Sequence, residues 1–575
     1  MLSIRRLKGS LLTGALALAI GAQAHAALTV NDSFEGAWFN AAEGGRGALV
    51  DFIPTTPGNG VLFITIFSYD TAGNPLWLTT QTPVVEGEYS WTNMDVLRFT
   101  GGTFGTPFST PASTVLGKAN VSFGSCSDMR INFTPAAGVT LPAVNYTFDR
   151  PGTVPKTCVY TQPFSACPTG TTAVAGVDRV CKITSPVTGD VRLSNAATYL
   201  IDGPTLVGSG RNTGPGRLII EPGTVISGSG ATLSYMAVQP GSQIIARGKP
   251  YAPIVFTGPT PVNGSWAGLV LAGNAQCNSS QDGSPCTYEA VASQQFGGTN
   301  NGDSSGVLEY VQVRYAGQEV RPNEELNAIT MLGVGSGTIV NHVQVYGGKD
   351  DGIEFFGGTV NLRNVVVQGA EDDALDFDLG YQGNIQYAYV RQVPEIGVIG
   401  SDSNGIESDN HPNSFDLQPR TRPTISNFTL IGAAGGNEGI RLRRGSGANY
   451  AKGLVVGFNA EGLNFNDGAT FTNAGTPTAL GTQLQMRDMF LSNTTNFEDN
   501  GSGEPYAVSA WYAAGTNNLT GASPLARSTP FPSSAAAVRL AAPTKPGEFF
   551  DANDFIGAFQ SADDNWAAGW TFDLR

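Results

Sequence analysis

Two stretches in the second half of the chain decide the fold: VQVYGGKDDGIEFFG (residues 343–357) and VVVQGAEDDALDFDLG (residues 365–380), which align at an offset of 22 residues. A second pair, RLIIEPGTVISGSG (residues 217–230) and YMAVQPGSQIIARG (residues 235–248), aligns at an offset of 18. Repeats of about 20 residues that carry strand-length apolar runs are typical of a β-solenoid, whereas propeller blades repeat at about 40 residues or more. The sequence therefore predicts an all-β coil of stacked strands.

The composition agrees with many short strands joined by tight turns. The chain has 575 residues, of which 74 are glycines and only 14% are charged. Its formal net charge is −15. A hydrophobic content of 41% is enough to bury a core and excludes disorder over most of the chain. Because acids exceed bases, the chain offers no basic surface for phosphate groups, and we expect no nucleic-acid partner.

The N-terminus has the pattern of a secretory signal peptide at residues 1–26. Three basic residues precede an apolar run (residues 11–19), and a small-x-small exit ends at Ala26. The apolar run is too short to span a membrane. We therefore expect cleavage after Ala26, no transmembrane segment in the mature chain, and a secreted protein that is periplasmic, bound to the cell surface or extracellular.

All six cysteines follow the predicted cleavage point, and an even number suits disulfides in an oxidising compartment. The gaps between the cysteines contain no repeated CxxC pair, so a zinc site is not expected. Six cysteines allow 15 connectivities, and the spacing suggests bridges between sequence neighbours: Cys126–Cys158, Cys167–Cys181 and Cys277–Cys286.

Residues 27–150 are predicted to form a separate antiparallel β-sandwich or barrel, because strand-like runs alternate with turn residues such as TAGNP (residues 71–75). The region contains GAWFN (residues 36–40), GRGALVDF (residues 45–52) and SYDTAGNPLWL (residues 68–78). In these motifs it resembles a domain common in secreted proteobacterial proteins, and the resemblance implies no known chemistry. A sugar-stacking platform is one interpretation of its tryptophans, but we expect core packing for all three: Trp38, Trp77 and Trp91.

Four further motifs stand in the rest of the chain: PIVFTG (residues 253–258), SWAGLVLAGNA (residues 265–275), DDGIEFFGGTV (residues 350–360) and WAAGWT (residues 566–571). With them this region resembles right-handed parallel β-helices of the pectin-lyase-like class, and more closely a set of uncharacterised secreted bacterial proteins. It implies a right-handed parallel β-helix and says little about activity. We expect a disulfide-stapled linker that leads into the coil (151–199), the β-helix (200–510), and a spacer with a C-terminal cap (511–575).

Five successive turns of the predicted coil share one pattern, in which a buried Ile or Leu is followed by polar residues. Because side chains alternate along a strand, the apolar residues point inward and the residues that follow them point outward. The inward residues are Ile353, Leu375, Ile406, Ile440 and Leu463. The outward residues form two predicted columns, Glu354, Asp376, Glu407, Arg441 and Asn464, and Phe356, Asp378, Asp409, Arg443 and Asn466.

Neighbouring strands lie about 4.8 Å apart, so the two columns predict a square of four carboxylates: Asp376, Asp378, Glu407 and Asp409. Facing like charges require a raised pKa, an arginine or a bound cation. One interpretation is a Ca²⁺ site formed by these four acids, assisted by Asn404 and backbone carbonyls. In the other, the twin aspartates cap turns through backbone N–H groups and the outward acids are solvated or pair with arginines.

The same residues allow an enzymatic interpretation. The paired aspartates in DDGI and DDAL resemble those of polygalacturonases, but His342 and His411 do not stand in the contexts of that family. A glycan lyase or hydrolase would use Asp376, Glu407 and Arg441 in catalysis, because paired carboxylates serve glycoside hydrolysis. Substrate would be bound by Arg443, Asn464 and Asn466.

The sequence leads us to expect a non-catalytic, secreted or cell-surface β-helix that binds calcium together with a polysaccharide or a cell-surface component. A polysaccharide lyase or glycoside hydrolase that acts on an acidic glycan is the alternative. A groove over the acidic square favours the enzyme, and a flat face favours binding.

Overall fold

The computed structural model describes residue 30 and residues 32–56, 59–84, 88–103, 109–151, 164–280, 282–288, 290–291, 294–321, 324–499, 501 and 503–575. The predicted signal peptide and Cys158 lie outside these residues. The other two predicted disulfides are present, Cys167–Cys181 and Cys277–Cys286. Among the described residues, no helix has both the length and the apolar character needed to cross a membrane.

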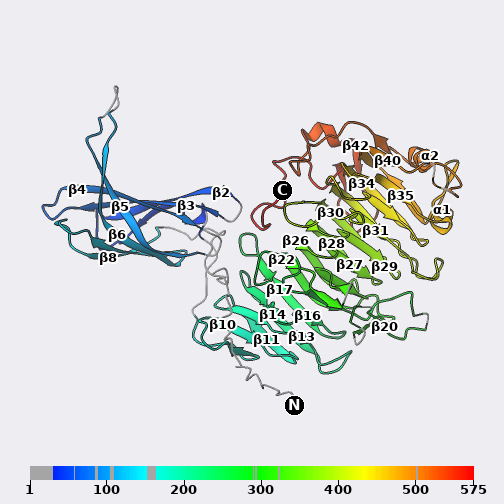
Figure 1. The fold of residues 1–575 in the computed structure, drawn as a ribbon, viewed down its shortest axis with the longest axis horizontal. Coiled ribbons are helices and arrows are strands. Elements are labelled where there is room, and N and C mark those ends of the chain that lie inside the picture. The colour runs from blue at the N-terminus through cyan, green and yellow to red at the C-terminus, as the bar shows by residue number, and fades with distance from the viewer. Residues whose placement is uncertain are drawn as a thin grey trace, which may run out of the picture.

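The N-terminal region is a closed antiparallel barrel, which decides between the two architectures predicted for it (Figure 1). A short 3-10 helix, η1 (Asp32–Phe34), precedes eight strands: β1 (Gly36–Phe39), β2 (Gly47–Thr56), β3 (Asn59–Tyr69), β4 (Pro75–Val84), β5 (Ser90–Thr100), β6 (Ala112–Ser125), β7 (Asp128–Pro135) and β8 (Val144–Asp149). Strand β1 closes the barrel by pairing with β8 at Phe39 and Asp149. Trp38 and Trp91 are core residues as predicted, at 0% and 7% exposure, whereas Trp77 is 66% exposed.

The second region is a parallel β-helix, as predicted, and one of its faces is a ten-stranded parallel sheet. Its strands follow one another in chain order: β13 (Pro204–Val207), β16 (Tyr235–Val238), β19 (Gly268–Ala272), β25 (Ile329–Leu332), β27 (Ile353–Phe356), β29 (Leu375–Asp378), β31 (Ile406–Ser408), β33 (Ile440–Leu442), β35 (Glu461–Phe465) and β40 (Thr495–Phe497). The inward residues Ile353, Leu375, Ile406, Ile440 and Leu463 are directly paired in register and fully buried.

A second, bent sheet forms the remaining sides of the coil. Its strands are β9 (Thr171–Ala173), β10 (Val180–Ile183), β11 (Gly189–Leu193), β12 (Thr198–Ile201), β14 (Gly216–Ile220), β15 (Val225–Gly228), β17 (Gln243–Arg247), β18 (Ile254–Thr257), β22 (Gly306–Ala316), β26 (Ile339–Gly348), β28 (Asn361–Ala370), β30 (Asn384–Arg391), β32 (Thr424–Ile431), β34 (Ala448–Val456), β38 (Leu484–Arg487), β39 (Phe490–Ser492) and β41 (Leu519–Thr520). Strand β22 pairs with both β17 and β18, so from this turn to β34 one long strand replaces two short ones, and β34 then pairs with the two short strands β38 and β39.

The long strands bend at one residue each, and these residues form a column along the coil. Each has a positive φ between 52° and 62°, a conformation that non-glycine residues seldom adopt. The column consists of Tyr310, His342, Asn364, Tyr387, Asn427 and Lys452. The bend turns the residues on its two sides toward different faces of the coil.

Two helices lie at the C-terminal end of the coil. Helix α1 (Gly468–Ala474) is capped by the Asp467 side chain, and α2 (Val508–Ala514) places Trp511 in the main core. The Trp511 indole nitrogen donates a hydrogen bond of 2.7 Å to the carbonyl oxygen of Ala474. The open end of the apolar core is thereby covered.

Residues 539–575, here called the C-terminal strap, run along the flank of the bent sheet and include β42 (Arg539–Thr544) and β43 (Asn553–Phe555). The buried amide of Gln344 donates to the Phe572 carbonyl and accepts from the Phe572 N–H, both at 2.7 Å. Gln386 makes the same pair of bonds with Asp551, at 3.1 and 2.9 Å. Two glutamines thus bind the strap as a neighbouring strand would.

One 3-10 helix and four two-stranded ladders complete the description of these residues. They are η2 (Ala535–Val538) and four short ladders: β20 (Cys286–Thr287) with β21 (Gln295–Phe296), β23 (Glu319–Arg321) with β24 (Glu324–Glu325), β36 (Gly475–Thr476) with β37 (Ala479–Leu480), and β42 with β43. The first of these ladders begins at Cys286 of the Cys277–Cys286 disulfide, and Cys277, Cys286, Tyr288 and Phe296 pack over part of the ten-stranded sheet.

Candidate functional site

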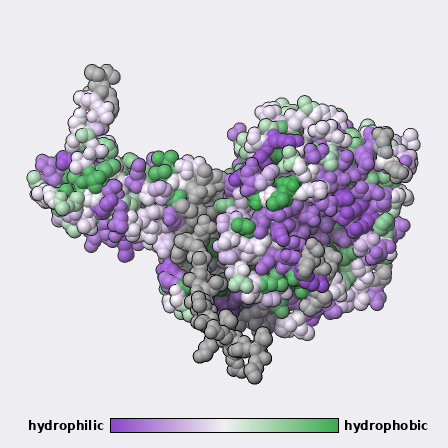
Figure 2. Space-filling view, viewed as in Figure 1, coloured by the Kyte–Doolittle hydropathy of each residue, from purple (hydrophilic) through white to green (hydrophobic). Residues whose placement is uncertain are grey.

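The pairing register of the ten-stranded sheet places one outward residue of each turn in a single column. Glu354 is paired with Asp376, Asp376 with Glu407, Glu407 with Arg441, and Arg441 with Asn464. The sheet therefore changes along its length from acidic to basic to amide side chains. Figure 2 shows hydrophilic residues gathered on the coil in the area where Figure 1 labels β27, β29 and β31.

Before the acidic turns, the same face of the sheet is apolar and covered. Val270, Leu332 and Phe356 pack under a loop that contains the Cys277–Cys286 disulfide and Tyr288, and the rings of Phe356 and Tyr288 meet edge to face at 5.3 Å. The amide of Asn278 in this loop donates to the Asn410 carbonyl at 2.8 Å. This contact ties the loop to the segment after β31, so the acidic turns lie beside a fixed wall.

The twin aspartates form a ladder that runs from turn to turn. Asp351 Oδ1 accepts from the N–H of Asp373 at 3.0 Å, and Asp373 Oδ1 accepts from the N–H of Asn404 at 2.9 Å. Asn404 Oδ1 continues the ladder by accepting from the N–H of Glu438 at 2.9 Å. Asp351 and Asp373 therefore accept hydrogen bonds from backbone N–H groups, as one interpretation of the sequence expects. These N–H groups belong to the next turn of the coil and not to the turn of the aspartate itself.

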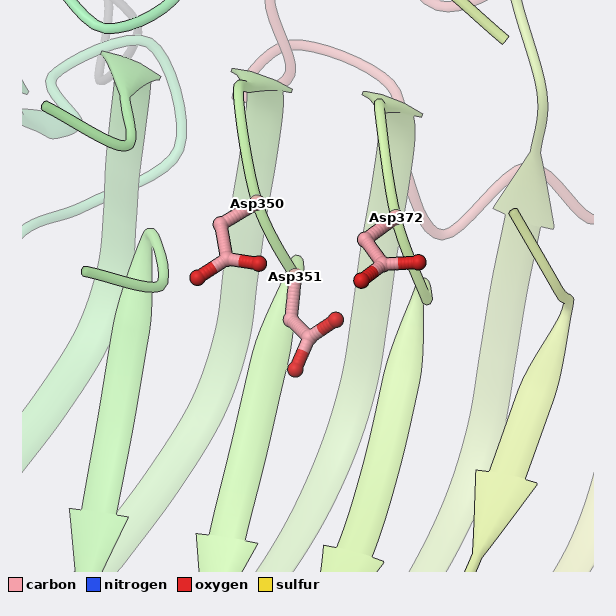
Figure 3. A group of neighbouring side chains, drawn as sticks. All are labelled: Asp350, Asp351 and Asp372. Carbon is pink, nitrogen blue, oxygen red and sulfur yellow. The ribbon is translucent and has the colours of Figure 1, made fainter. Parts of the chain in front are cut away.

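Carboxylates of the column and of the ladder meet in one acidic cluster. Three groups of acids each have ligand oxygens within 4.8 Å of one another: Asp350, Asp351 and Asp372; Asp351, Glu354 and Asp376; and Asp373, Asp376 and Glu407. Figure 3 shows Asp350 and Asp372 on neighbouring turns, with the Asp351 side chain extending between them. Asp376 belongs to two of the groups and links them.

Burial and mutual repulsion disfavour the ionised forms of these acids. Burial, with the neighbouring carboxylates, raises the pKa of Asp351, Asp373 and Asp376 well above the usual range. Burial also raises the pKa of Asp372 to about 6. Asp376 Oδ1 is buried and has no hydrogen-bond partner among the described residues. The cluster is thus short of positive charge or protons.

Arginines neutralise the far side of the cluster. Arg443 contacts Glu407 and pairs with Asp409 at 2.8 Å, and Arg444 reaches Asp409 at 2.7 Å. Burial alone would lower the pKa of Arg443, but Glu407 and Asp409 outweigh it and the pKa is raised. The Glu407 carboxyl remains perturbed, because burial raises its pKa to about 7 despite Arg443.

Arg441 and the two asparagines form the end of the site. Arg441 pairs with Asp402 at 2.6 Å and with Glu407 at 3.3 Å. Its Nε donates to Asn466 Oδ1 at 3.2 Å, and Asn466 is exposed. Asn464 is only 3% exposed, and its amide donates to Glu438 at 2.6 Å.

The structure places only two of the four predicted metal ligands in one group of neighbouring acids. Asp376 and Glu407 share a metal-compatible group, whereas the three such groups found among the described residues include neither Asp378 nor Asp409. Asp378 Oδ1 accepts from the N–H of Leu379 at 2.6 Å. The sequence analysis placed Glu354 beside Asp376 but did not include it in the predicted metal site, and it missed the ladder. The available signal was an Asp or Asn two residues before the inward Ile353, Leu375 and Ile406.

A parallel β-helix with a row of acids and arginines on an outer sheet defines the class of protein. Residues 184–571 match the family model described as "Pectate-lyase like beta helix domain", which covers more than half of the chain. The chain therefore belongs to the pectate-lyase-like β-helix family. Searches of curated proteins and of solved structures found no match.

Proposed function

We propose that this protein is a secreted β-helix protein that binds Ca²⁺ in the acidic cluster and a polysaccharide on the adjoining face of the ten-stranded sheet. The observation that carries the proposal is the position of Asp376. Its unpartnered, buried Oδ1 lies in a carboxylate that belongs to two groups of acids with the spacing of metal ligands. A cation there would remove the repulsion that raises the pKa values of the cluster.

The residues that fit the ion best are Asp351, Glu354 and Asp376. Calcium binds six to eight oxygens at about 2.3–2.6 Å, so ligand oxygens can lie up to about 5 Å apart across it. Asp373 and Glu407 provide an alternative set with Asp376, but Glu407 already binds two arginines. No ion pair with an arginine or lysine involves Asp351 or Asp376 among the described residues, which leaves their charge to be neutralised by the ion.

Polysaccharide is the proposed ligand because of the family fold and the side chains beside the cluster. Arg441, Arg443 and Asn466 supply hydrogen-bond donors on one face, and a bound Ca²⁺ would accept carboxylate or hydroxyl oxygens of a glycan. The arginines do not serve as bases in this proposal. The two carboxylates that bind Arg443 keep it protonated.

Glycan cleavage is the second candidate, and Glu407 favours it. Its pKa of about 7 suits a group that exchanges protons near neutral pH, and Asp376 is its direct cross-strand neighbour. In that case Asp376, whose raised pKa keeps it protonated, would protonate the leaving oxygen while Glu407 acts as nucleophile or base. Incubation with acidic and neutral polysaccharides, read out as new reducing or unsaturated ends, separates the two functions, and Glu407→Gln is the matched control.

Calorimetric titration with Ca²⁺ tests the first proposal. We expect the intact protein to bind Ca²⁺ and Asp376→Asn to lose at least about tenfold in affinity, because a ligand oxygen and its charge are removed. Asp190→Asn is the control, since Asp190 is an exposed coil residue that pairs with Arg217. Equal affinities for the intact protein and Asp376→Asn would overturn the calcium proposal.

A further inference from the structure

The outer surface of the N-terminal barrel carries a row of aromatic side chains across four strands. Phe39 is paired with Gly47, Gly47 with Phe67, and Phe67 with Trp77. Directly opposite residues of antiparallel strands point to the same face, so the three rings lie on one side with the side-chain-free Gly47 between two of them. At about 4.8 Å per strand, the row is about 15 Å long.

This aromatic row faces outward and is not part of the barrel core. The exposed fractions are 40% for Phe39, 42% for Phe67 and 66% for Trp77. The barrel interior is filled from the other face of the same strands, for example by Trp38, which is fully buried. None of the ring–ring contacts found among the described residues involves the three rings of the row. Figure 2 shows hydrophobic residues on the barrel surface near the strands labelled β4 and β5 in Figure 1.

Polar turns border the aromatic row at one end of the barrel. Phe39 is the last residue of β1, and the turn that follows contains the exposed pair Arg46 and Glu43, 3.4 Å apart. Trp77 follows the turn between β3 and β4, where Asp70 and Asn74 are hydrogen-bonded and exposed. Exposed ring faces next to charged and amide groups suit a ligand with an apolar face and a polar edge.

We propose that the aromatic row binds the hexopyranose rings of a neutral polysaccharide, by stacking of sugar C–H faces on Phe39, Phe67 and Trp77. A sugar ring has an apolar C–H face and a rim of hydroxyls, which matches rings bordered by Arg46, Glu43 and Asn74. A row of about 15 Å accommodates more than one ring of an extended glycan. This site goes beyond the coil function, because it lies in the barrel and uses no acidic cluster and no metal.

Tryptophan fluorescence of the full chain gives a direct measurement. Trp77, at 66%, is the most exposed of the seven tryptophans, because five are at most 7% exposed and Trp566 is half-buried. Titration with soluble neutral glucans, xylans and mannans in EDTA should move the emission to shorter wavelength as Trp77 leaves water. The Trp77→Phe variant should lose this spectral change and retain most of the binding measured by affinity electrophoresis.

The double variant Phe67→Ala/Trp77→Ala should bind the same glycans about tenfold or more weakly, because two stacking surfaces are lost. The control is Ile53→Ala, an equally exposed residue of β2 away from the aromatic row. Unchanged binding in the double variant would overturn the proposal. The proposal would also be overturned if, in sedimentation velocity, the intact protein and the Ile53→Ala control form a concentration-dependent dimer and the double variant does not. The aromatic row would then bind a second copy of the chain.

The Asp376→Asn variant distinguishes this proposal from the coil function. It should retain glycan binding to the barrel in EDTA even where calcium binding is lost. Failure of the calcium site therefore leaves the result for the aromatic row unaffected, and the converse also holds.

Discussion

Two outward columns on different faces of the same coil differ in whether the C-terminal strap covers them. On the bent sheet, Gln312 is paired with Gln344 and Tyr389 with Thr429, and the strap covers this column. On the ten-stranded sheet, the column from Glu354 to Asn464 carries acids and an arginine and is not covered by the strap.

The difference between the two columns is one of charge and partner. Neutral amides and hydroxyls of the first column form hydrogen bonds with backbone groups of the strap; for example, the Thr429 hydroxyl oxygen accepts from the N–H of Ala558 at 2.9 Å. Buried carboxylates repel one another and need protons, arginines or a cation. The comparison indicates that the flank of the bent sheet is structural, whereas the acidic cluster is suited to a ligand.

The largest expected effect comes from breaking the strap. Trp570 is 2% exposed and packs edge to face on Tyr310 and His342, with ring centroids 6.0 and 5.4 Å away. Trp570→Ala should lower the free energy of unfolding of the coil by about 3–5 kcal/mol, measured by urea denaturation. Calcium affinity should stay unchanged. A loss of calcium binding in the folded variant would contradict the separation of the two faces.

An intermediate effect is expected from pH. A carboxyl whose pKa is raised in the folded state binds more protons folded than unfolded, so the folded state loses stability as pH rises through the folded pKa. With the pKa of Glu407 at about 7, this carboxyl alone should cost the calcium-free protein about 0.8 kcal/mol of stability between pH 6.5 and 8.

His342 makes a smaller, opposite contribution in this pH window. Burial lowers its pKa to about 4, so it is neutral in the folded state, whereas in the unfolded state it is half protonated at pH 6.5; its deprotonation there returns about 0.4 kcal/mol of stability by pH 8. Thermal unfolding at several pH values, with EDTA or excess Ca²⁺, measures the effect. Calcium should remove most of the decline, and equal slopes in both buffers would show that the cluster does not bind the ion.

The smallest effect is expected from Asp351→Asn, which tests the ladder. Asparagine keeps the Oδ1 that accepts the Asp373 N–H, so the free energy of unfolding without calcium should change by less than about 0.5 kcal/mol or rise slightly. Asp351→Ala is the matched comparison and should cost about 1–3 kcal/mol, because a buried N–H loses its acceptor. If both variants are equally stable, the ladder bond contributes nothing measurable to the fold.

Much of the coil was predictable because its pattern is local. The offset of 22 residues fixed the stacking of Ile353 on Leu375, and strand alternation placed Glu354, Asp376 and Glu407 in one outward column. The ladder was less visible, since one side-chain oxygen binds a backbone N–H of the next turn, which a single repeat does not reveal. Side-chain geometry decided which of the acids pair with an arginine and which do not.

The sequence alone determined that apolar runs of strand length recur about once per turn, so that burying them requires a stacked coil and brings acids of successive turns together. Only the tertiary structure decided which columns are covered: Gln344 and Phe572 are 228 residues apart in sequence. It also decided that Trp77 lies outside the barrel while Trp38 lies inside. The physical reason is that periodicity fixes which residues share a face, whereas the segment that covers that face is set by long-range packing and hydrogen bonding.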